Sequence, residues 1–210
     1  LNSKPSAADQ PQLPGVWFDV KARAGTTAAT VIALHGRGDT ARNFGSITRG
    51  FSAALAWRVL EGPLNFGKGR QWFESDQVRR DASAAKATLD LVRAHIKSID
   101  GPVVLVGFSQ GCMTILHLAA EGADKVSAAA CIGGWLIGEP TWSATARFPL
   151  LFVNGANDQI AKPASVRAAI QAFENRGFAT EQIEFGGGHQ VPMEEAPRIS
   201  EWLIAKARAR

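Results

Sequence analysis

The segment Gly107-Phe108-Ser109-Gln110-Gly111 has the residue types of a reactive serine turn. It directly follows the apolar run Val103–Val106 and opens a segment with helical character. Between a strand and a helix, Gly-x-Ser-x-Gly forms a sharp turn that presents the serine hydroxyl, and the two glycines leave room where side chains would clash. The helix start also directs free N–H groups and a positive dipole end at the serine. The pattern predicts Ser109 as a nucleophile, against the alternative of a chance glycine-rich turn.

A serine hydroxyl is a weak nucleophile, so a base must accept its proton and an acid must orient that base. In hydrolases with this turn the chain order is serine, then carboxylate, then histidine. Of the four histidines, His189 alone follows both a predicted strand and a run of three glycines. His35 precedes the serine, whereas His95 and His117 lie inside predicted helices. We therefore predict His189 as the base.

Asp158 is the candidate for the orienting acid, because it follows the predicted strand Leu150–Val153 and lies between the serine and the histidine in the chain. Asp124 also follows the serine, but it lies in a turn and is interpreted as a solvated carboxylate. Asp158 has two other interpretations, an Asx turn or the cap of the next helix. Chain order and location favour Asp158 as the third member of the group.

An acyl-transfer site also needs two N–H donors for the developing oxyanion. One is predicted to be the backbone N–H of Gln110, the residue after the serine. The second is assigned to the backbone N–H of Arg37, in a turn where Gly36 and Gly38 permit the geometry. Phosphate binding is the alternative interpretation of this turn, but the turn lacks the lysine and the spacing of a P-loop.

Short apolar runs alternate with amphipathic segments from residue 16 onward, which predicts an α/β fold with a mostly parallel central sheet and helices on both faces. The predicted strands are Val16–Val20, Thr30–Leu34, Arg58–Leu60, Val103–Val106, Val126–Cys131, Leu150–Val153 and Gln182–Phe185. The predicted helices run from Asp81 or Ser83 to Ile99, from Gln110 to Glu121, from Pro163 to Gly177 and from Glu194 to Ala207.

The 210 residues are expected to form one domain over 16–210, after a flexible proline-rich leader over 1–15. The net charge is +4, but Lys and Arg are scattered, so no nucleic-acid partner is expected. No apolar run approaches 18 residues, so no membrane span is expected. The leader lacks the apolar core of a signal peptide, so a cytoplasmic location is expected. An exported mature form stays open, because the chain does not begin with Met.

Several motifs, taken in order, resemble the phospholipase/carboxylesterase family of small α/β-hydrolases, which includes the acyl-protein thioesterases. They are Leu34–Asp39, Trp72-Phe73, Gly107–Gly111, Asn154–Asp158 and Gly188-His189. The resemblance spans roughly residues 16–205. It implies an α/β-hydrolase fold with a minimal lid, no cofactor, and hydrolysis of carboxylic esters or thioesters. It also implies the same pair of oxyanion donors.

The sequence departs from the family pattern at places that bear on the substrate. Arg37 stands where the family commonly has an apolar residue, and Cys112 where it has a small one. The stretch after Trp72-Phe73 is short compared with the thioesterases. These departures argue against a long-chain acyl substrate. The loop Leu64–Trp72, where a cover could form, contains glycines, Lys68 and Arg70 but few aliphatic residues. We therefore predict short or medium acyl esters, with an aromatic rim from Trp72, Phe73 and Trp135. The alternative is that these aromatic residues belong to the core, and for Trp135 the two interpretations weigh about equally.

Other functions are also compatible with the sequence. The first alternative is an acyl-thioesterase or lysophospholipase of the same family, and the second a non-catalytic binding protein with a hydrolase fold. A nucleotide-binding module is the third, although no Gly-x-Gly-x-x-Gly opens a helix. A small-molecule ester is the expected partner, and a homodimer stays open. Cys112 and Cys131 lack metal-ligand spacing, so no metal is expected. They could form a disulfide, but free buried thiols are commoner.

Overall fold

The computed structural model describes residues 15–24 and 27–209. The leader predicted over residues 1–15 therefore lies, apart from Gly15, outside the described part of the chain. No helix in the described ranges is long and apolar enough to cross a membrane.

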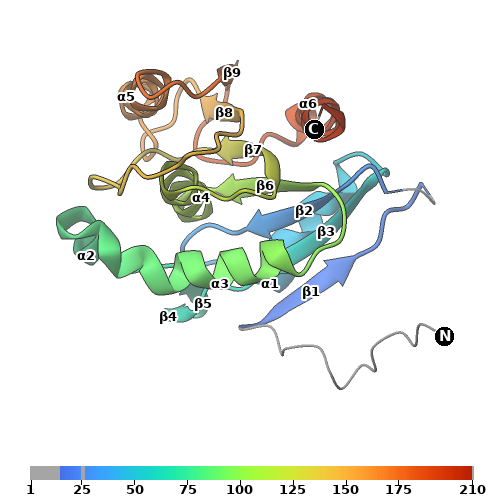
Figure 1. Cartoon of the computed structure of the whole chain (residues 1–210), viewed down its shortest axis with the longest axis horizontal. Helices are drawn as coiled ribbons and strands as arrows, with labels where there is room; N and C mark the ends of the chain where they lie inside the picture. Colours follow the sequence, from blue (N-terminus) through green and yellow to red (C-terminus); the bar gives the residue numbers. More distant parts are fainter. Residues whose placement is uncertain (1–14, 25–26, 210) are drawn as a thin grey trace.

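A seven-stranded sheet with the order β1-β3-β2-β6-β7-β8-β9 forms the centre of the molecule (Figure 1). Only β1 is antiparallel, to β3, and the other pairs are parallel. The prediction of a mostly parallel sheet is thus confirmed, with every predicted strand present. The strands are β1 (Trp17–Val20), β2 (Ala29–Leu34), β3 (Leu55–Leu60), β6 (Val103–Phe108), β7 (Val126–Ile132), β8 (Leu150–Gly155) and β9 (Thr180–Phe185).

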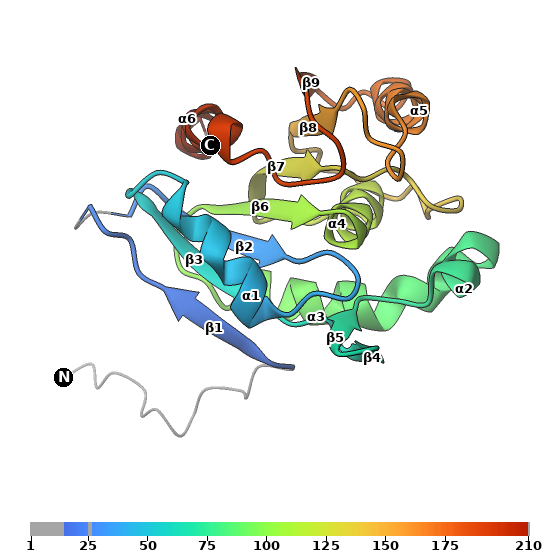
Figure 2. The same ribbon diagram turned by 180° about the vertical axis from the view of Figure 1, so that it is seen from behind.

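Helices cover both faces of this sheet (Figures 1 and 2). The α-helices are α1 (Ala41–Phe44), α2 (Ser75–Arg80), α3 (Lys86–Lys97), α4 (Gln110–Glu121), α5 (Pro163–Glu174) and α6 (Ala196–Arg208). Short 3-10 segments are η2 (Gly45–Arg49), η3 (Ala82–Ala85) and η4 (Met193–Glu195). Apolar residues of α3, α4 and α5 pack on one face, and those of α1 and α6 on the other.

The alternation of side chains along a strand explains why the core has two halves. In β2, Ile32 and Leu34 face the α3–α4–α5 layer. Val31 and Ala33 face the α1–α6 layer instead. Each central strand is therefore apolar on both sides, as its unbroken apolar run predicts. Parallel pairing then brings the carboxyl ends of β2, β6, β8 and β9 to one edge.

A small hairpin of β4 (Leu64–Phe66) and β5 (Gly69–Gln71) forms where the sequence predicted no strand. Gly67 in its turn has φ +58°, which favours glycine. The hairpin packs on the turn after β2: Gly38 N–H donates to Arg70 O at 2.8 Å, and Arg70 N–H to Asp39 O at 2.9 Å. A Cβ at Gly69 would collide with the Gly38 carbonyl. The hairpin thus fixes the turn that was predicted to supply an oxyanion donor.

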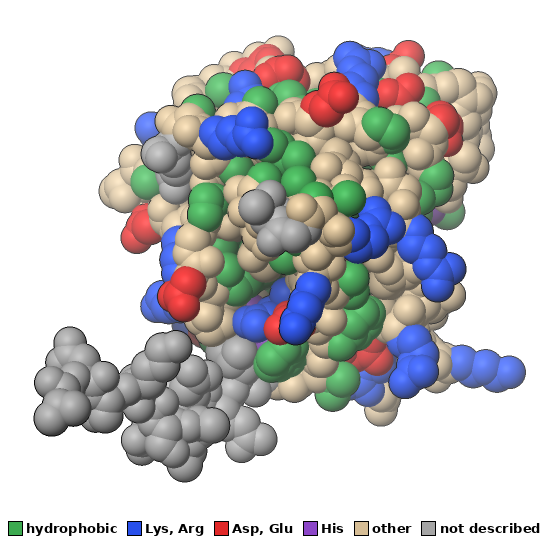
Figure 3. All heavy atoms as spheres, turned by 90° about the vertical axis from the view of Figure 1, so that its right-hand side faces the viewer, with side chains coloured by type: hydrophobic (Ala, Val, Ile, Leu, Met, Phe, Trp, Pro, Cys, Tyr) green, Lys and Arg blue, Asp and Glu red, His purple; other side chains and the backbone are tan. Residues whose placement is uncertain are grey.

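Charged side chains of both signs are interspersed on the face shown in Figure 3, with hydrophobic side chains between them. Basic residues do not form one continuous patch on that face, in keeping with the scattered Lys and Arg of the sequence.

Candidate active site

Ser109 lies at the turn between β6 and α4 with φ 52° and ψ −115°. It is the one non-glycine residue with positive φ in the described part of the chain. Such a conformation costs about 1–3 kcal/mol and must be held by its surroundings. A Cβ at Gly107 would lie 2.6 Å from the Gly111 carbonyl, and one at Gly111 would lie 2.8 Å from the His35 carbonyl oxygen. Both glycines are therefore sterically required, as the sequence pattern predicts.

A chain of hydrogen bonds joins the three residues predicted to act together. His189 Nε2 lies 3.0 Å from Ser109 Oγ, and His189 Nδ1 lies 2.8 Å from Asp158 Oδ2. A carboxylate only accepts, so Nδ1 carries the proton and Nε2 accepts from the serine hydroxyl. The Asp158 side chain is fully buried, whereas that of His189 is 17% exposed. The imidazole of His189 therefore lies between the buried carboxylate of Asp158 and the hydroxyl of Ser109.

The other oxygen of Asp158 is held by the backbone that follows it. Oδ1 accepts from the N–H groups of Ile160 and Ala161, each at 2.8 Å. The Asx-type turn that the sequence left as an alternative is thus present together with the contact to His189. One carboxylate serves both, because its two oxygens face different partners.

The loops after β8 and β9 are packed against each other, which places Asp158 beside His189. A Cβ at Gly155 would lie 2.5 Å from the Gly188 carbonyl oxygen, so only glycine permits this approach. The His189 ring also stacks on Phe108, with centroids 4.9 Å apart and planes inclined by 37°. The imidazole position is thus set from both sides.

The remaining sequence candidates lie elsewhere. Asp124 is exposed at the amino end of β7, the opposite edge of the sheet. His35 is buried: Nδ1 lies 2.7 Å from Gly36 O, and Nε2 accepts from Gly62 N–H at 3.0 Å. His117 is also buried and pairs with the Ile137 carbonyl through Nε2 at 2.8 Å. Burial lowers the pKa of both imidazoles. His95 is buried in α3.

The backbone N–H groups of Arg37 and Gln110 donate to no acceptor within the described residues. Their neighbour Gly38 does donate, to Arg70 O. A Cβ at Gly36 would lie 3.4 Å from Ser109 Cβ, so the turn after β2 is adjacent to the serine. Two unpaired N–H groups beside a serine suit an oxyanion, and the assignment of this pair stays a prediction.

Trp72 and Phe73 do not form the aromatic rim that the sequence favoured, because both are buried in the core. The Trp72 indole N–H donates to His35 O at 2.7 Å. Gln110 Oε1 accepts from Trp72 N–H at 2.8 Å, and Gln110 Nε2 donates to Phe73 O at 2.9 Å. Here the two aromatic residues connect the start of α4 to the turn after β2. An aromatic pair at a strand end does not by itself distinguish rim from core.

Ser109 opens into a cavity of about 230 Å³. Its lining residues are Arg37, Ser75, Asp76, Arg79, Ser109, Gln110, Met113, Trp135, Ile137 and Ile160. Trp135 is thus the one predicted aromatic residue that lines it. The sequence did not identify the remaining lining residues, which are Ser75, Asp76, Arg79, Met113, Ile137 and Ile160. Of these, only Met113 could have been predicted, because it lies four residues after Ser109, one turn into the helix that the serine precedes.

Cys112 and Cys131 are free and buried. Burial and the neighbouring Cys131 raise the pKa of the Cys112 thiol. A Cβ at Gly134 would overlap Cys112 Sγ, so this thiol is enclosed by backbone. The interpretation as free buried thiols is therefore confirmed.

The parallel sheet, its helical layers and the strand-to-helix serine turn define an α/β-hydrolase fold. The model of the serine hydrolase (FSH1) family matches residues 26–199, and the chain belongs to this family. This agrees with the family resemblance seen in the sequence motifs.

Solved structures of esterases and a thioesterase share this fold. Esterase PE8 has a TM-score of 0.74 at 19% identity, over 88% of this chain and 95% of its own. Acyl-protein thioesterase 2 of Zea mays has a TM-score of 0.73 at 19% identity, over 92% of this chain and 100% of its own. A carboxylesterase from Mesorhizobium loti has a TM-score of 0.68 at 17% identity, over 87% of this chain and 91% of its own.

Proposed function

We propose that this serine hydrolase cleaves carboxylic esters with short or medium acyl chains through an acyl-enzyme on Ser109. The observation that carries the proposal is the hydrogen-bond chain from Asp158 through His189 to Ser109, at the opening of a cavity. Membership of the serine hydrolase family supports the general chemistry.

The proposed reaction has two halves. In the first, Ser109 Oγ bonds to the carbonyl carbon while His189 Nε2 takes the hydroxyl proton. The N–H groups of Arg37 and Gln110 stabilise the resulting oxyanion. The intermediate then collapses, the bond to the alcohol oxygen breaks, and His189 returns its proton to that oxygen. Asp158 stabilises the imidazolium and keeps its ring in place.

In the second half a water molecule attacks the acyl carbon of the serine ester. His189 accepts the water proton, and the second oxyanion forms at the same two N–H groups. Its collapse breaks the bond to Ser109 Oγ, which recovers a proton from His189. A carboxylic acid leaves, and the free serine is restored.

The volume and lining of the cavity favour a short or medium acyl group over a long one. Its volume of about 230 Å³ is below the range of roughly 300–1,000 Å³ usual for sites that bury larger ligands. Arg37 and Arg79 line it together with Met113 and Ile137, so the apolar part is confined. A long acyl chain needs a continuous apolar channel, because each buried CH₂ contributes about 0.8 kcal/mol.

A panel of p-nitrophenyl esters from acetate to palmitate tests this proposal. We expect kcat/KM to be highest for a short or medium chain and to fall for palmitate. A steady rise through palmitate would contradict the acyl-chain assignment. An octanoyl thioester assayed beside the octanoyl ester distinguishes the thioesterase alternative, which predicts the thioester as the better substrate at equal chain length.

The nucleophile is tested separately with a fluorophosphonate probe and peptide mapping. We expect a single labelled peptide that carries the adduct on Ser109, and no adduct in Ser109→Ala. Labelling at another residue would overturn the mechanism, whatever the ester preference. A chain that binds esters but turns none over would instead support the non-catalytic binding protein.

A further inference from the structure

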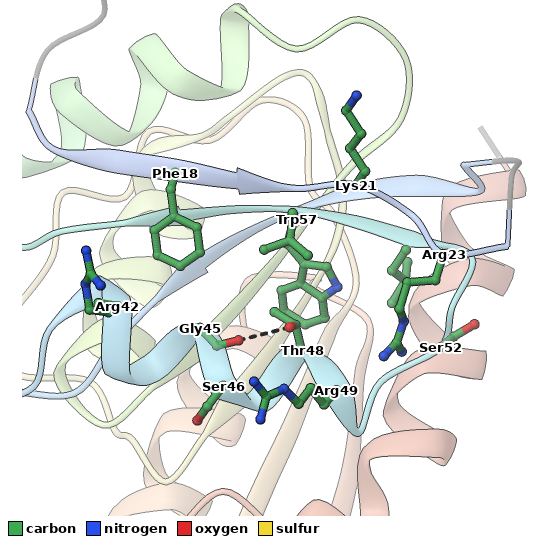
Figure 4. A pocket seen from close by; sticks show the side chains of 12 residues that line it. Phe18, Lys21, Arg23, Arg42, Gly45, Ser46, Thr48, Arg49, Ser52 and Trp57 are labelled. Carbon is green, nitrogen blue, oxygen red and sulfur yellow. Dashed lines mark hydrogen bonds between the residues drawn. The ribbon is translucent and has the colours of Figure 1, made fainter.

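A second cavity, of about 660 Å³, lies between the β1–β3 pair and η2. It shares no lining residue with the cavity at Ser109. Figure 4 shows it from close by, with the Phe18 and Trp57 rings between β1 and η2. The catalytic proposal assigns no role to this space.

Apolar side chains form one wall of this second cavity. Trp57 is 2% exposed, and its indole is fixed by an edge-to-face contact with Phe51 at 5.0 Å and 78°. Val20 pairs with Trp57 across the β1–β3 ladder and also lines the cavity. Phe18 packs against η2 where Gly45 has no side chain, because a Cβ there would collide with the ring. This wall is therefore rigid and suits an aliphatic chain or a ring.

The charged lining of the cavity is entirely basic. Lys21, Arg23, Arg42 and Arg49 line it, and all four are exposed. Its described lining contains no Asp or Glu. Within residues 15–24 and 27–209 none of the four is in a salt bridge, whereas Arg58 on β3 pairs with Asp19 at 2.8 Å.

Three of these cations border the cavity from different sides. In Figure 4, Arg42, Arg49 and Arg23 surround the two rings, while the Lys21 side chain extends away from them. Arg23 Nη2 donates to Phe51 O at 2.9 Å, which holds this guanidinium at the cavity edge. Gathered cations without carboxylate partners favour an anion, since each guanidinium still has donors for a charge-assisted hydrogen bond.

We infer that this cavity is a second binding site, for a small amphipathic carboxylate. The apolar part of the ligand packs on Phe18, Val20 and Trp57, and its carboxylate lies at the basic rim that Arg23, Arg42 and Arg49 form around these rings. A volume of about 660 Å³ is within the usual range for small-molecule sites. The inference stands whether or not the ester chemistry at Ser109 holds, because the two cavities have separate linings.

The test is a calorimetric titration of decanoate, below its micelle concentration, into the full chain. We compare the wild type with Arg42→Gln/Arg49→Gln and with the control Arg167→Gln/Arg208→Gln. The control removes two exposed arginines that also have no salt bridge among the described residues. We expect the control to bind like the wild type, and the first variant to bind about tenfold or more weakly.

Two further ligands separate the head group from the chain. Decanol has the chain without the charge and acetate the charge without the chain, so both should bind more weakly than decanoate. Equal decanoate affinity in the two double variants would place the ligand elsewhere, the Ser109 cavity included, and would overturn the inference. Absence of saturable decanoate binding to the wild type, or decanol binding as tightly as decanoate, would overturn it too.

Discussion

At the scale of single residues, the proposed chemistry depends on three side chains that act as a unit. Ser109→Ala and His189→Ala are each expected to lower kcat by on the order of 10⁴ or more, because nothing else supplies the nucleophile or the base. Asp158→Asn should cost somewhat less, since this side chain transfers no proton. Steady-state kinetics on p-nitrophenyl butyrate measures the losses, and circular dichroism checks that each variant is folded.

His117→Ala is the control for that series. Its ring pairs with the Ile137 carbonyl in the core, so its loss should lower stability and leave the proposed machinery in place. If His117→Ala abolished turnover in folded protein while His189→Ala did not, the assignment of the base would be wrong.

The arrangement of these residues was largely predictable from the sequence, and the surroundings of the substrate were not. Ser109, Asp158 and His189 were found because a short motif and the chain order restrict the choice. Trp72 was wrongly assigned to the aromatic rim of the substrate site, because the residue type alone does not distinguish a rim position from a core position. Its burial follows from the indole contact to His35 O, a partner 37 residues away that no local pattern reveals.

At the scale of elements, close packing of backbones makes certain glycines irreplaceable. Gly111→Ala should lower the free energy of unfolding by about 1–3 kcal/mol, because its Cβ would collide with the Leu34 carbonyl and force α4 away from β2. Activity should fall as well, since the serine turn shifts with the helix. Urea unfolding and ester hydrolysis measure the two effects.

Gly186→Ala provides the matched control. A Cβ at this position meets nothing within 4 Å, and the residue does not have positive φ. Its stability should therefore stay within about 0.5 kcal/mol of the wild type. Helix propensity and unfolded-chain entropy both favour Ala over Gly, so an equal loss in both variants would contradict backbone collision as the cause of the cost at Gly111.

Elements with a long apolar pattern were predicted, whereas short ones were missed. The central strands and the helices α3–α6 present apolar faces over several residues, so their period is visible. The hairpin β4–β5 has three-residue strands, and α1 and α2 are about a turn or two long. Their conformation depends on contacts such as Gly38 N–H with Arg70 O, which join segments far apart in the sequence.

At the scale of the whole molecule, two buried imidazoles couple folding to pH. Burial lowers the pKa of His35 and His117 from the ordinary value of 6.5. Below that pH the unfolded chain takes up protons that the folded chain does not. The contribution of His35 and His117 to the free energy of unfolding therefore has its full value above pH 6.5. It falls as the pH drops from 6.5 toward the lowered pKa values of the two folded-state imidazoles.

His117→Gln tests this coupling, because glutamine can still donate to the Ile137 carbonyl but does not titrate. From about pH 5 to 8, the free energy of unfolding in urea should depend less steeply on pH in the variant, by up to about 1.4 kcal/mol per pH unit. Asp90 and Glu181, whose pKa values are lowered by hydrogen bonds, titrate at lower pH. Identical pH slopes would exclude His117 as a contributor.

The separation of the proposed nucleophile and base along the chain has a consequence for biosynthesis. Ser109 is translated 80 residues before His189, and the ribosome adds α6 only after that. While the chain grows, β6 and α4 can form, but the imidazole that would deprotonate the serine does not yet exist. Under the proposed mechanism, a chain that ends before His189 is expected to be inert toward esters, and hydrolysis is expected only once β9 has paired with β8.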